Sequence, residues 1–169
     1  MASAETVTVR RATNQDEPGV LECLSAAFAP FEPSYTPHAY RDTVLDADAL
    51  HKRMHTMAVY VAVSAAGETV GTISCQTLSA EDGKIRGMAV KPAWQGRGIG
   101  LQLLNAVEAD LRRRNCRRLR LDTTKPLETA IRFYVSHGFR ESGMVTDFYG
   151  MDLIEYVKDL SAAATQSAS

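Results

Sequence analysis

One stretch of the sequence decides the fold, and it reads Val90-Lys91-Pro92-Ala93-Trp94-Gln95-Gly96-Arg97-Gly98-Ile99-Gly100. An apolar run over residues 85–90 precedes it, three alternate glycines form a loop, and an apolar-periodic helix then begins. A strand, a glycine loop and a helix N-terminus in this order bind anions, because free backbone N–H groups and the helix dipole favour negative charge. Glycine lets a phosphate approach the backbone, since a Cβ atom would block it. The stretch therefore predicts a site for a phosphate-bearing ligand.

The composition indicates an ordinary globular protein of one domain, with 169 residues, 45% hydrophobic and 23% charged. A net charge of −1 gives no reason to expect nucleic acid as a partner, and no apolar segment approaches a membrane span, so no membrane is expected. Residues 1–5 do not resemble a signal peptide. Cys23, Cys75 and Cys116 are scattered and odd in number, which favours free thiols and a cytoplasmic location.

Hydrophobic periodicity predicts a single α/β (α+β) domain over residues 1–160 and a flexible C-terminal tail over residues 161–169. We expect strands at residues 6–10, 58–63, 69–75, 84–90, 118–123, 139–141 and 147–153. We expect helices at residues 14–28, 37–57 with a break near 46, 97–114, and from 124 or 125 to 137. This order predicts a mixed, mostly antiparallel sheet of about seven strands flanked by about four helices.

Other glycine-rich motifs do not fit the loop. The chain has no G-x-x-x-x-G-K-[ST] run, which argues against a nucleoside triphosphatase. A dinucleotide motif, G-x-G-x-x-G, fails because Leu101 and Leu103 stand where its third glycine belongs. A loop without a ligand is disfavoured, since each glycine inside an element costs about 0.5–1 kcal/mol relative to alanine.

Two motifs resemble those of the GNAT superfamily of N-acetyltransferases. Residues 95–100 fit its Q/R-x-x-G-x-G/A acetyl-CoA motif, and residues 130–139 fit an A-x-x-x-Y-x-x-x-G-F pattern. Both stand in the family's order and at its separation, and the expected elements agree across nearly the whole chain. The resemblance implies acetyl-CoA as cosubstrate and a parallel, splayed pair of strands at the centre of the sheet.

The resemblance assigns the pyrophosphate of coenzyme A to the loop amides and the helix N-terminus. It implies that the edge of the strand before the loop pairs with the pantetheine arm, as an added strand would, and polarises the thioester carbonyl. The implied cofactor-binding residues are Met88, Ala89, Val90, Gln95, Gly96, Arg97, Gly98, Ile99, Gly100, Thr123, Thr124 and Phe133.

Tyr134 is the catalytic candidate, because it stands where the family has a tyrosine that protonates the leaving thiolate. A phenol suits this role, since its pKa of about 10 is near that of an alkyl thiol. The alternative interpretation, an aromatic side chain that packs beside Phe133 and Phe139, stays open at this point.

The sequence does not identify the acceptor or the general base. Many relatives have a glutamate where this chain has Lys84, so Glu81, Asp82, Glu32 and direct loss of the proton to solvent remain alternatives. Aromatic residues in the expected acceptor segments would cage an ammonium group or would pack as a lid. The candidate acceptor residues are Phe31, Tyr35, Glu81 and Tyr149.

The implied function is transfer of an acetyl group from acetyl-CoA to a primary amine by direct attack, with a small molecule favoured over a protein as acceptor. A non-catalytic module that binds acetyl-CoA and regulates a partner is the alternative, and a homodimer is also left open. His51 and His55 have no third ligand nearby, so no metal site is expected. The arginine-rich residues 112–120 are interpreted as cations at a helix C-terminus rather than a nucleic-acid surface.

Overall fold

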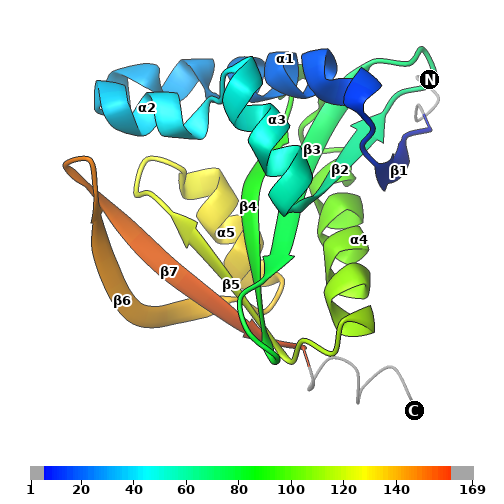
Figure 1. The fold of residues 1–169 in the computed structure, drawn as a ribbon. Helices are drawn as coiled ribbons and strands as arrows, with labels where there is room; N and C mark the ends of the chain where they lie inside the picture. Colours follow the sequence, from blue (N-terminus) through cyan, green and yellow to red (C-terminus); the bar gives the residue numbers. More distant parts are fainter. Residues whose placement is uncertain (1–5, 161–169) are drawn as a thin grey trace.

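A seven-stranded sheet organises the computed structural model, which describes residues 6–160 (Figure 1). The strand order is β1-β2-β3-β4-β5-β7-β6, and every neighbouring pair is antiparallel except the parallel pair β4 and β5. The strands are β1 Thr8–Arg11, β2 Ala58–Val63, β3 Thr69–Thr77, β4 Asp82–Val90, β5 Arg118–Thr123, β6 Arg140–Phe148 and β7 Met151–Asp159. The predicted mixed sheet with a central parallel pair is confirmed.

Five α-helices of the described chain cover the two faces of the sheet. They are α1 Glu17–Phe28, α2 Pro37–Thr43, α3 Ala47–Thr56, α4 Ile99–Arg113 and α5 Glu128–Ser136. Short 3-10 turns lie at Asn14–Asp16, Ala29–Ser34 and Pro92–Trp94. The expected helix at 37–57 is two helices, because Asp46 caps α3 by accepting a hydrogen bond from the Ala49 N–H at 2.8 Å. The break near residue 46 is thus confirmed, and the helix count is one higher than expected.

The core consists of two apolar layers, one on each face of the sheet. Alternate side chains of β2 enter different layers: Tyr60 and Ala62 pack with α4 and α5, whereas Val61 packs with α1 and α3. Figure 1 shows α1 and α3 on the opposite side of the sheet from α4. The layer beneath α4 contains its apolar stripe, Ile99, Leu103, Leu104, Val107 and Leu111.

The parallel strands β4 and β5 stay together over only part of their length. Their pairing runs from Asp82 opposite Arg118 to Ile85 opposite Leu121. Beyond that point β4 continues along β3, and β5 continues along β7 up to Thr123 opposite Ile154. Each strand keeps its outer partner, so the two diverge and the sheet opens at its centre.

A bulge in β4 lies just past the point of divergence. Arg86 pairs with Ser74 and Ala89 with Thr72, so Gly87 and Met88 together oppose a single residue of β3. Gly87 has a φ of 62°, a left-handed conformation that glycine adopts without the penalty other residues incur. The bulge bends β4 where it leaves β5.

The final hairpin lies later in the chain than predicted. The strands expected at 139–141 and 147–153 are β6, Arg140–Phe148, and β7, Met151–Asp159. They meet at a turn in which Tyr149 and Gly150 have φ values of 50° and 92°. The boundaries were wrong because the side chains of β6 are exposed along almost the whole strand, which therefore lacks an alternating apolar pattern. The predicted tail, residues 161–169, lies outside the described residues.

Packing of α4 on the sheet gives a stability prediction. Leu103 is fully buried, at 0% exposure, so Leu103→Ala should lower the free energy of unfolding by about 2–5 kcal/mol, measured by urea denaturation. The matched control is Leu78→Ala at a site 51% exposed, which should change it by about 0.5 kcal/mol or less. Equal effects of the two substitutions would contradict the described packing.

Candidate active site

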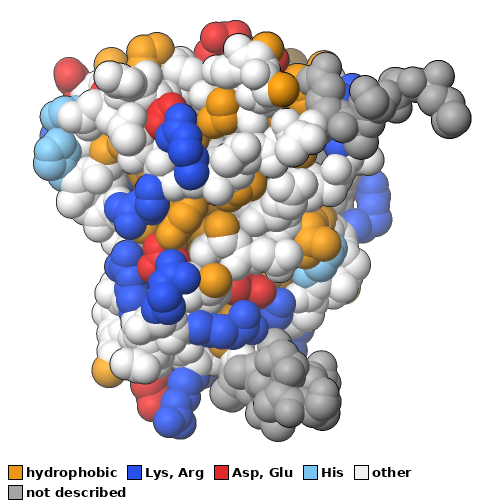
Figure 2. Space-filling view, turned by 90° about the vertical axis from the view of Figure 1, so that its right-hand side faces the viewer, with side chains coloured by type: hydrophobic (Ala, Val, Ile, Leu, Met, Phe, Trp, Pro, Cys, Tyr) orange, Lys and Arg blue, Asp and Glu red, His pale blue; other side chains and the backbone are white. Residues whose placement is uncertain are grey.

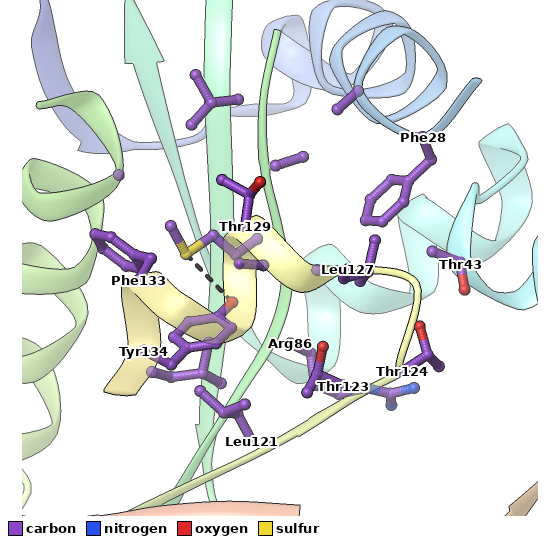
Figure 3. Close-up of a pocket in the computed structure, with 18 of the residues that line it drawn as sticks. Phe28, Thr43, Arg86, Leu121, Thr123, Thr124, Leu127, Thr129, Phe133 and Tyr134 are labelled. Atoms are coloured by element: carbon purple, nitrogen blue, oxygen red, sulfur yellow. Dashed lines mark hydrogen bonds between the residues drawn. The ribbon is translucent and has the colours of Figure 1, made fainter. Parts of the chain in front are cut away.

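A cleft of about 1260 Å³ opens where β4 and β5 diverge. The bulged part of β4, the end of β5, the first turn of α4 and one side of α5 form its walls, together with the C-terminal end of α1. Figure 3 shows α5 crossing this cleft, with Phe133 directed toward α4 and Phe28 on the opposite side. The separated strands thus create a single cleft rather than a packed sheet centre.

The glycine loop enters this cleft at the N-terminus of α4. Gly96 and Gly98 have φ values of 77° and 80°, and Gly98 is the N-cap of α4 without a side chain that caps the first turn. A Cβ atom at either position would meet nothing within 4 Å, so the left-handed backbone and not crowding requires glycine here. The first N–H groups of α4 are therefore available to a ligand.

Gly100 plays a different part, because it makes room inside the cleft wall. A Cβ atom there would lie 3.0 Å from Cε of Met88 and 3.5 Å from the Phe133 ring. The absence of a side chain lets α4, α5 and β4 approach one another at this point. The glycine loop is consequently held against the edge of β4 and against α5, the helix that carries Tyr134.

Tyr134 is buried beneath the cleft, at 7% exposure. Its hydroxyl donates a hydrogen bond to Sδ of Met88 at 3.5 Å (Figure 3). Its ring also makes edge contacts with Phe133 and Phe139. The packing interpretation therefore applies to the ring of Tyr134, and the catalytic interpretation applies to its hydroxyl. Burial raises the pKa of the phenol well above 10, so the hydroxyl keeps its proton at neutral pH. The site therefore contains a protonated acid next to the β4 edge.

Most residues expected at the site line this cleft. Those that line it are Met88, Ala89, Val90, Gln95, Gly96, Gly98, Ile99, Gly100, Thr123, Thr124, Phe133, Tyr134, Phe31, Tyr35 and Tyr149. Arg97 and Glu81 are not among the lining residues. The Arg97 guanidinium lies over the Trp94 ring at 4.8 Å, and Glu81 precedes β4 at the end where β4 and β5 still pair.

The carboxylates suggested as a general base lie elsewhere than in the cleft lining. Asp82 pairs with Arg118 at 2.7 Å, and this hydrogen bond lowers the pKa of its carboxyl group. Glu32 lines a second, smaller cavity. Within residues 6–160 the carboxylates that line the main cleft are Asp42, Asp122 and Asp147, and Asp122 is bonded to Lys84 at 2.7 Å. Lys84 thus forms an ion pair within the lining of the cleft.

Two arginines of the cleft were missed by the sequence analysis. Arg53, on α3, and Arg86, on β4, both line it. No motif contains them, and residue 53 falls in an expected helix whose neighbours gave no functional signal. Alternation along β4 was the available clue for Arg86, since it places that side chain on the opposite face from Ile85.

Of the six arginines at residues 112–120, Arg114, Arg118 and Arg120 form ion pairs within the described residues, whereas Arg112, Arg113 and Arg117 form none there. Arg114 pairs with Asp110 at 2.7 Å, and Arg120 pairs with Glu155 at 2.9 Å. Figure 2 views the molecule from the right-hand side of Figure 1 and shows Lys and Arg side chains lying beside Asp and Glu. The ion pairs support a structural role for Arg114, Arg118 and Arg120.

Fold and site together define an α/β protein that can bind a phosphate-bearing ligand in a cleft with a proton donor. A model of the acetyltransferase (GNAT) family matches residues 20–139. An aminoglycoside N(6')-acetyltransferase type 1 from Stenotrophomonas maltophilia is 36% identical over 99 residues, 54% of this chain and 65% of that protein. The chain thus spans less than two thirds of that relative's length.

Two solved structures are similar across nearly the whole chain. A GNAT acetyltransferase from Staphylococcus aureus has a TM-score of 0.76 at 20% identity, covering 92% of this chain and 99% of that one. The PaiA N-acetyltransferase from Thermoplasma acidophilum, solved with coenzyme A, has a TM-score of 0.75 at 17% identity, covering 91% and 99%. These likenesses show a shared fold.

The chain belongs to the GNAT acetyltransferase family, because the family model covers more than half of its length. The resemblance predicted from the two motifs is confirmed. No helix within residues 6–160 is long and apolar enough to cross a membrane.

Proposed function

We propose that the protein is an N-acetyltransferase that moves the acetyl group of acetyl-CoA to a primary amine by direct attack. The observation that carries the proposal is that the glycine loop, the free edge of β4 and the Tyr134 hydroxyl all face one cleft. A glycine loop alone would only bind an anion, and a buried tyrosine alone would only pack its ring. Acyl transfer needs the three features together.

The coenzyme would lie along the diverging strands. Its pyrophosphate accepts hydrogen bonds from the loop and the first turn of α4, and the helix dipole adds to this attraction. Its pantetheine amides pair with the edge of β4 beyond Ile85, where β5 no longer supplies partners. Binding thus satisfies backbone groups that the divergence leaves without strand partners.

In the proposed reaction the unprotonated amine nitrogen attacks the thioester carbonyl carbon. The tetrahedral oxyanion accepts hydrogen bonds from backbone N–H groups of β4 near its bulge. The C–S bond then breaks, the Tyr134 hydroxyl gives its proton to the leaving thiolate, and the amine proton passes to water. Tyr134 recovers its proton from solvent, and the products are an amide and coenzyme A.

The enzyme's main contributions would be proximity and charge stabilisation, because the cleft holds both reactants next to fixed donors. The alternative, a module that binds acetyl-CoA without turnover, is tested by thiol release with a panel of amines. Saturable release supports the enzyme, whereas coenzyme binding with no release from any amine supports the module.

We propose a small amine-bearing molecule as the acceptor. The Stenotrophomonas maltophilia relative is named for aminoglycosides, which makes a polycationic amine the second candidate. A polycation needs an excess of carboxylates, but Asp122 already pairs with Lys84, and the two other carboxylates of the lining, Asp42 and Asp147, are matched in number by Arg53 and Arg86. The charges of the cleft therefore favour the less cationic acceptor.

The loop's role is tested by coenzyme affinity. Gly98→Ala forces a Cβ atom into a left-handed backbone with a φ of 80°, so the loop amides should shift and the Kd of coenzyme A should rise at least about 10-fold. Gly67→Ala is the matched control, since its φ is 86° and it lies in the turn between β2 and β3. Isothermal titration calorimetry giving the same Kd for both variants would refute this role.

The role of Tyr134 is tested by removing only its hydroxyl. Tyr134→Phe should lower kcat roughly 10²–10⁴-fold in the thiol-release assay, with the coenzyme Kd changed little. Because burial raises the pKa of this phenol, the wild-type kcat should show no loss from its ionisation up to about pH 10. Tyr156→Phe removes a buried hydroxyl outside the cleft and serves as control. An unchanged kcat in Tyr134→Phe would exclude Tyr134 from the mechanism.

A further inference from the structure

Two guanidinium groups lie at the bulge of β4. Arg86 belongs to the bulged segment, and Arg53 reaches it from α3. A Cβ atom at Gly87 would collide with Nη1 of Arg53, so glycine at this position lets the guanidinium lie directly against the strand. The bulge that opens the sheet therefore also places a cation beside the reaction site.

Neither guanidinium group has a hydrogen bond or an ion pair within residues 6–160, although both arginines line the cleft. Burial lowers the pKa of Arg53 to about 10; the Arg86 charge acts in the same direction, and Asp42 opposes them. The Arg53 guanidinium therefore remains charged at neutral pH. Two like charges held near each other in a cleft attract an anion.

No other charged group within residues 6–160 forms an ion pair with either guanidinium. Lys84 and Asp122 neutralise each other at 2.7 Å. Asp147 accepts a hydrogen bond from the Gly150 N–H at 3.2 Å, in the turn between β6 and β7. The charged residues that line the cleft are therefore three cations and three anions, but Arg53 and Arg86 lie together at the bulge, whereas Asp147 lies at the turn between β6 and β7.

A buried hydroxyl next to these residues also lacks a partner. Oγ1 of Thr123 is buried with no hydrogen-bond partner in the described chain, and Thr123 lines the cleft. Figure 3 shows Thr123 and Arg86 on the side of the cleft away from Phe133 and α4. A buried hydroxyl without a partner is unfavourable, so this one indicates that a bound ligand supplies a polar partner here.

We propose that the acceptor carries a carboxylate as well as its amine, and that Arg53 and Arg86 bind this carboxylate at the bulge of β4. The inference rests on the proposed acetyl transfer and names its substrate class: small, amino-acid-like amines. A planar guanidinium matches a carboxylate with two parallel hydrogen bonds, which would fix the amine's orientation toward the thioester.

The remainder of this acceptor should be apolar. Phe28, Pro30 and Phe31, from the C-terminal end of α1 and the turn after it, line the cleft. Figure 3 shows Phe28 on the same side as Arg86 and Thr43, opposite the α4 end. An amino acid with an apolar or aromatic side chain satisfies both the guanidinium pair and this wall.

The test compares amino acids with their carboxamides, which lack the carboxylate charge, and with a polyamine. Thiol release from acetyl-CoA is measured with leucine and phenylalanine, with their carboxamides, and with a polyamine such as spermidine. The carboxamides have the less basic amines, so intrinsic reactivity at pH 8 favours them. We expect kcat/KM to be at least about 10-fold higher for the carboxylates, because each carboxamide loses the charge-assisted pairs.

Substitutions then test whether Arg53 and Arg86 bind the carboxylate of the acceptor. Arg86→Gln and Arg53→Gln should reduce the carboxylate-to-carboxamide ratio of kcat/KM toward 1, through a higher KM for the carboxylates. Arg86 is exposed, so its variant should fold even if Arg53→Gln does not. Arg113→Gln removes an exposed charge that does not line the cleft and should keep the wild-type ratio.

The outcomes separate this inference from the proposed function. Turnover that is equal or better with carboxamides or spermidine, or a ratio unaffected by Arg86→Gln, overturns the carboxylate site and leaves acetyl transfer intact. Thiol release from none of these amines contradicts the proposed function itself.

Discussion

The rest of the structure depends on where the hydrogen bonds between β4 and β5 stop. Pairing ends at Ile85 and Leu121, while β3 and β7 hold the two strands on their outer sides. The bulge at Gly87 directs β4 away, and the backbone of Arg86–Val90 then has an edge without a strand partner. Backbone N–H and C=O groups are obligatory hydrogen-bonding groups, so this edge needs water or a ligand that resembles a strand. The pantetheine arm, with its own amides, is such a ligand.

The cleft has two ends with different chemistry. The α4 end carries the glycine loop and the unpaired amides of a helix N-terminus, which suit a diphosphate. The other end carries Arg86, Arg53 and the apolar wall beside Phe28. Tyr134 lies between them, and its hydroxyl contacts the sulfur of Met88 on β4. The coenzyme and the acceptor would therefore meet where the proton donor is already in place.

The donor half of the site could be predicted from sequence because its residues are local. Gly96, Gly98 and the start of α4 are contiguous, and their backbone requirements leave a visible glycine pattern. Tyr134 stands in a second contiguous motif. Arg53 and Arg86 gave no such signal, because they meet only when α3 packs over the bulge. The β6–β7 hairpin was misplaced for another reason: the exposed β6 has no apolar alternation.

The central claim is that acetyl-CoA binds where β4 and β5 diverge, next to Tyr134, and the most direct test of it is a crystal structure with coenzyme A bound. We expect the pyrophosphate oxygens within about 3.2 Å of backbone N–H nitrogens in the loop and first turn of α4. We expect the pantetheine along the β4 edge, and the sulfur within about 4 Å of the Tyr134 hydroxyl. A coenzyme bound outside the strand gap, or a sulfur on the far side of α5 from that hydroxyl, would contradict it.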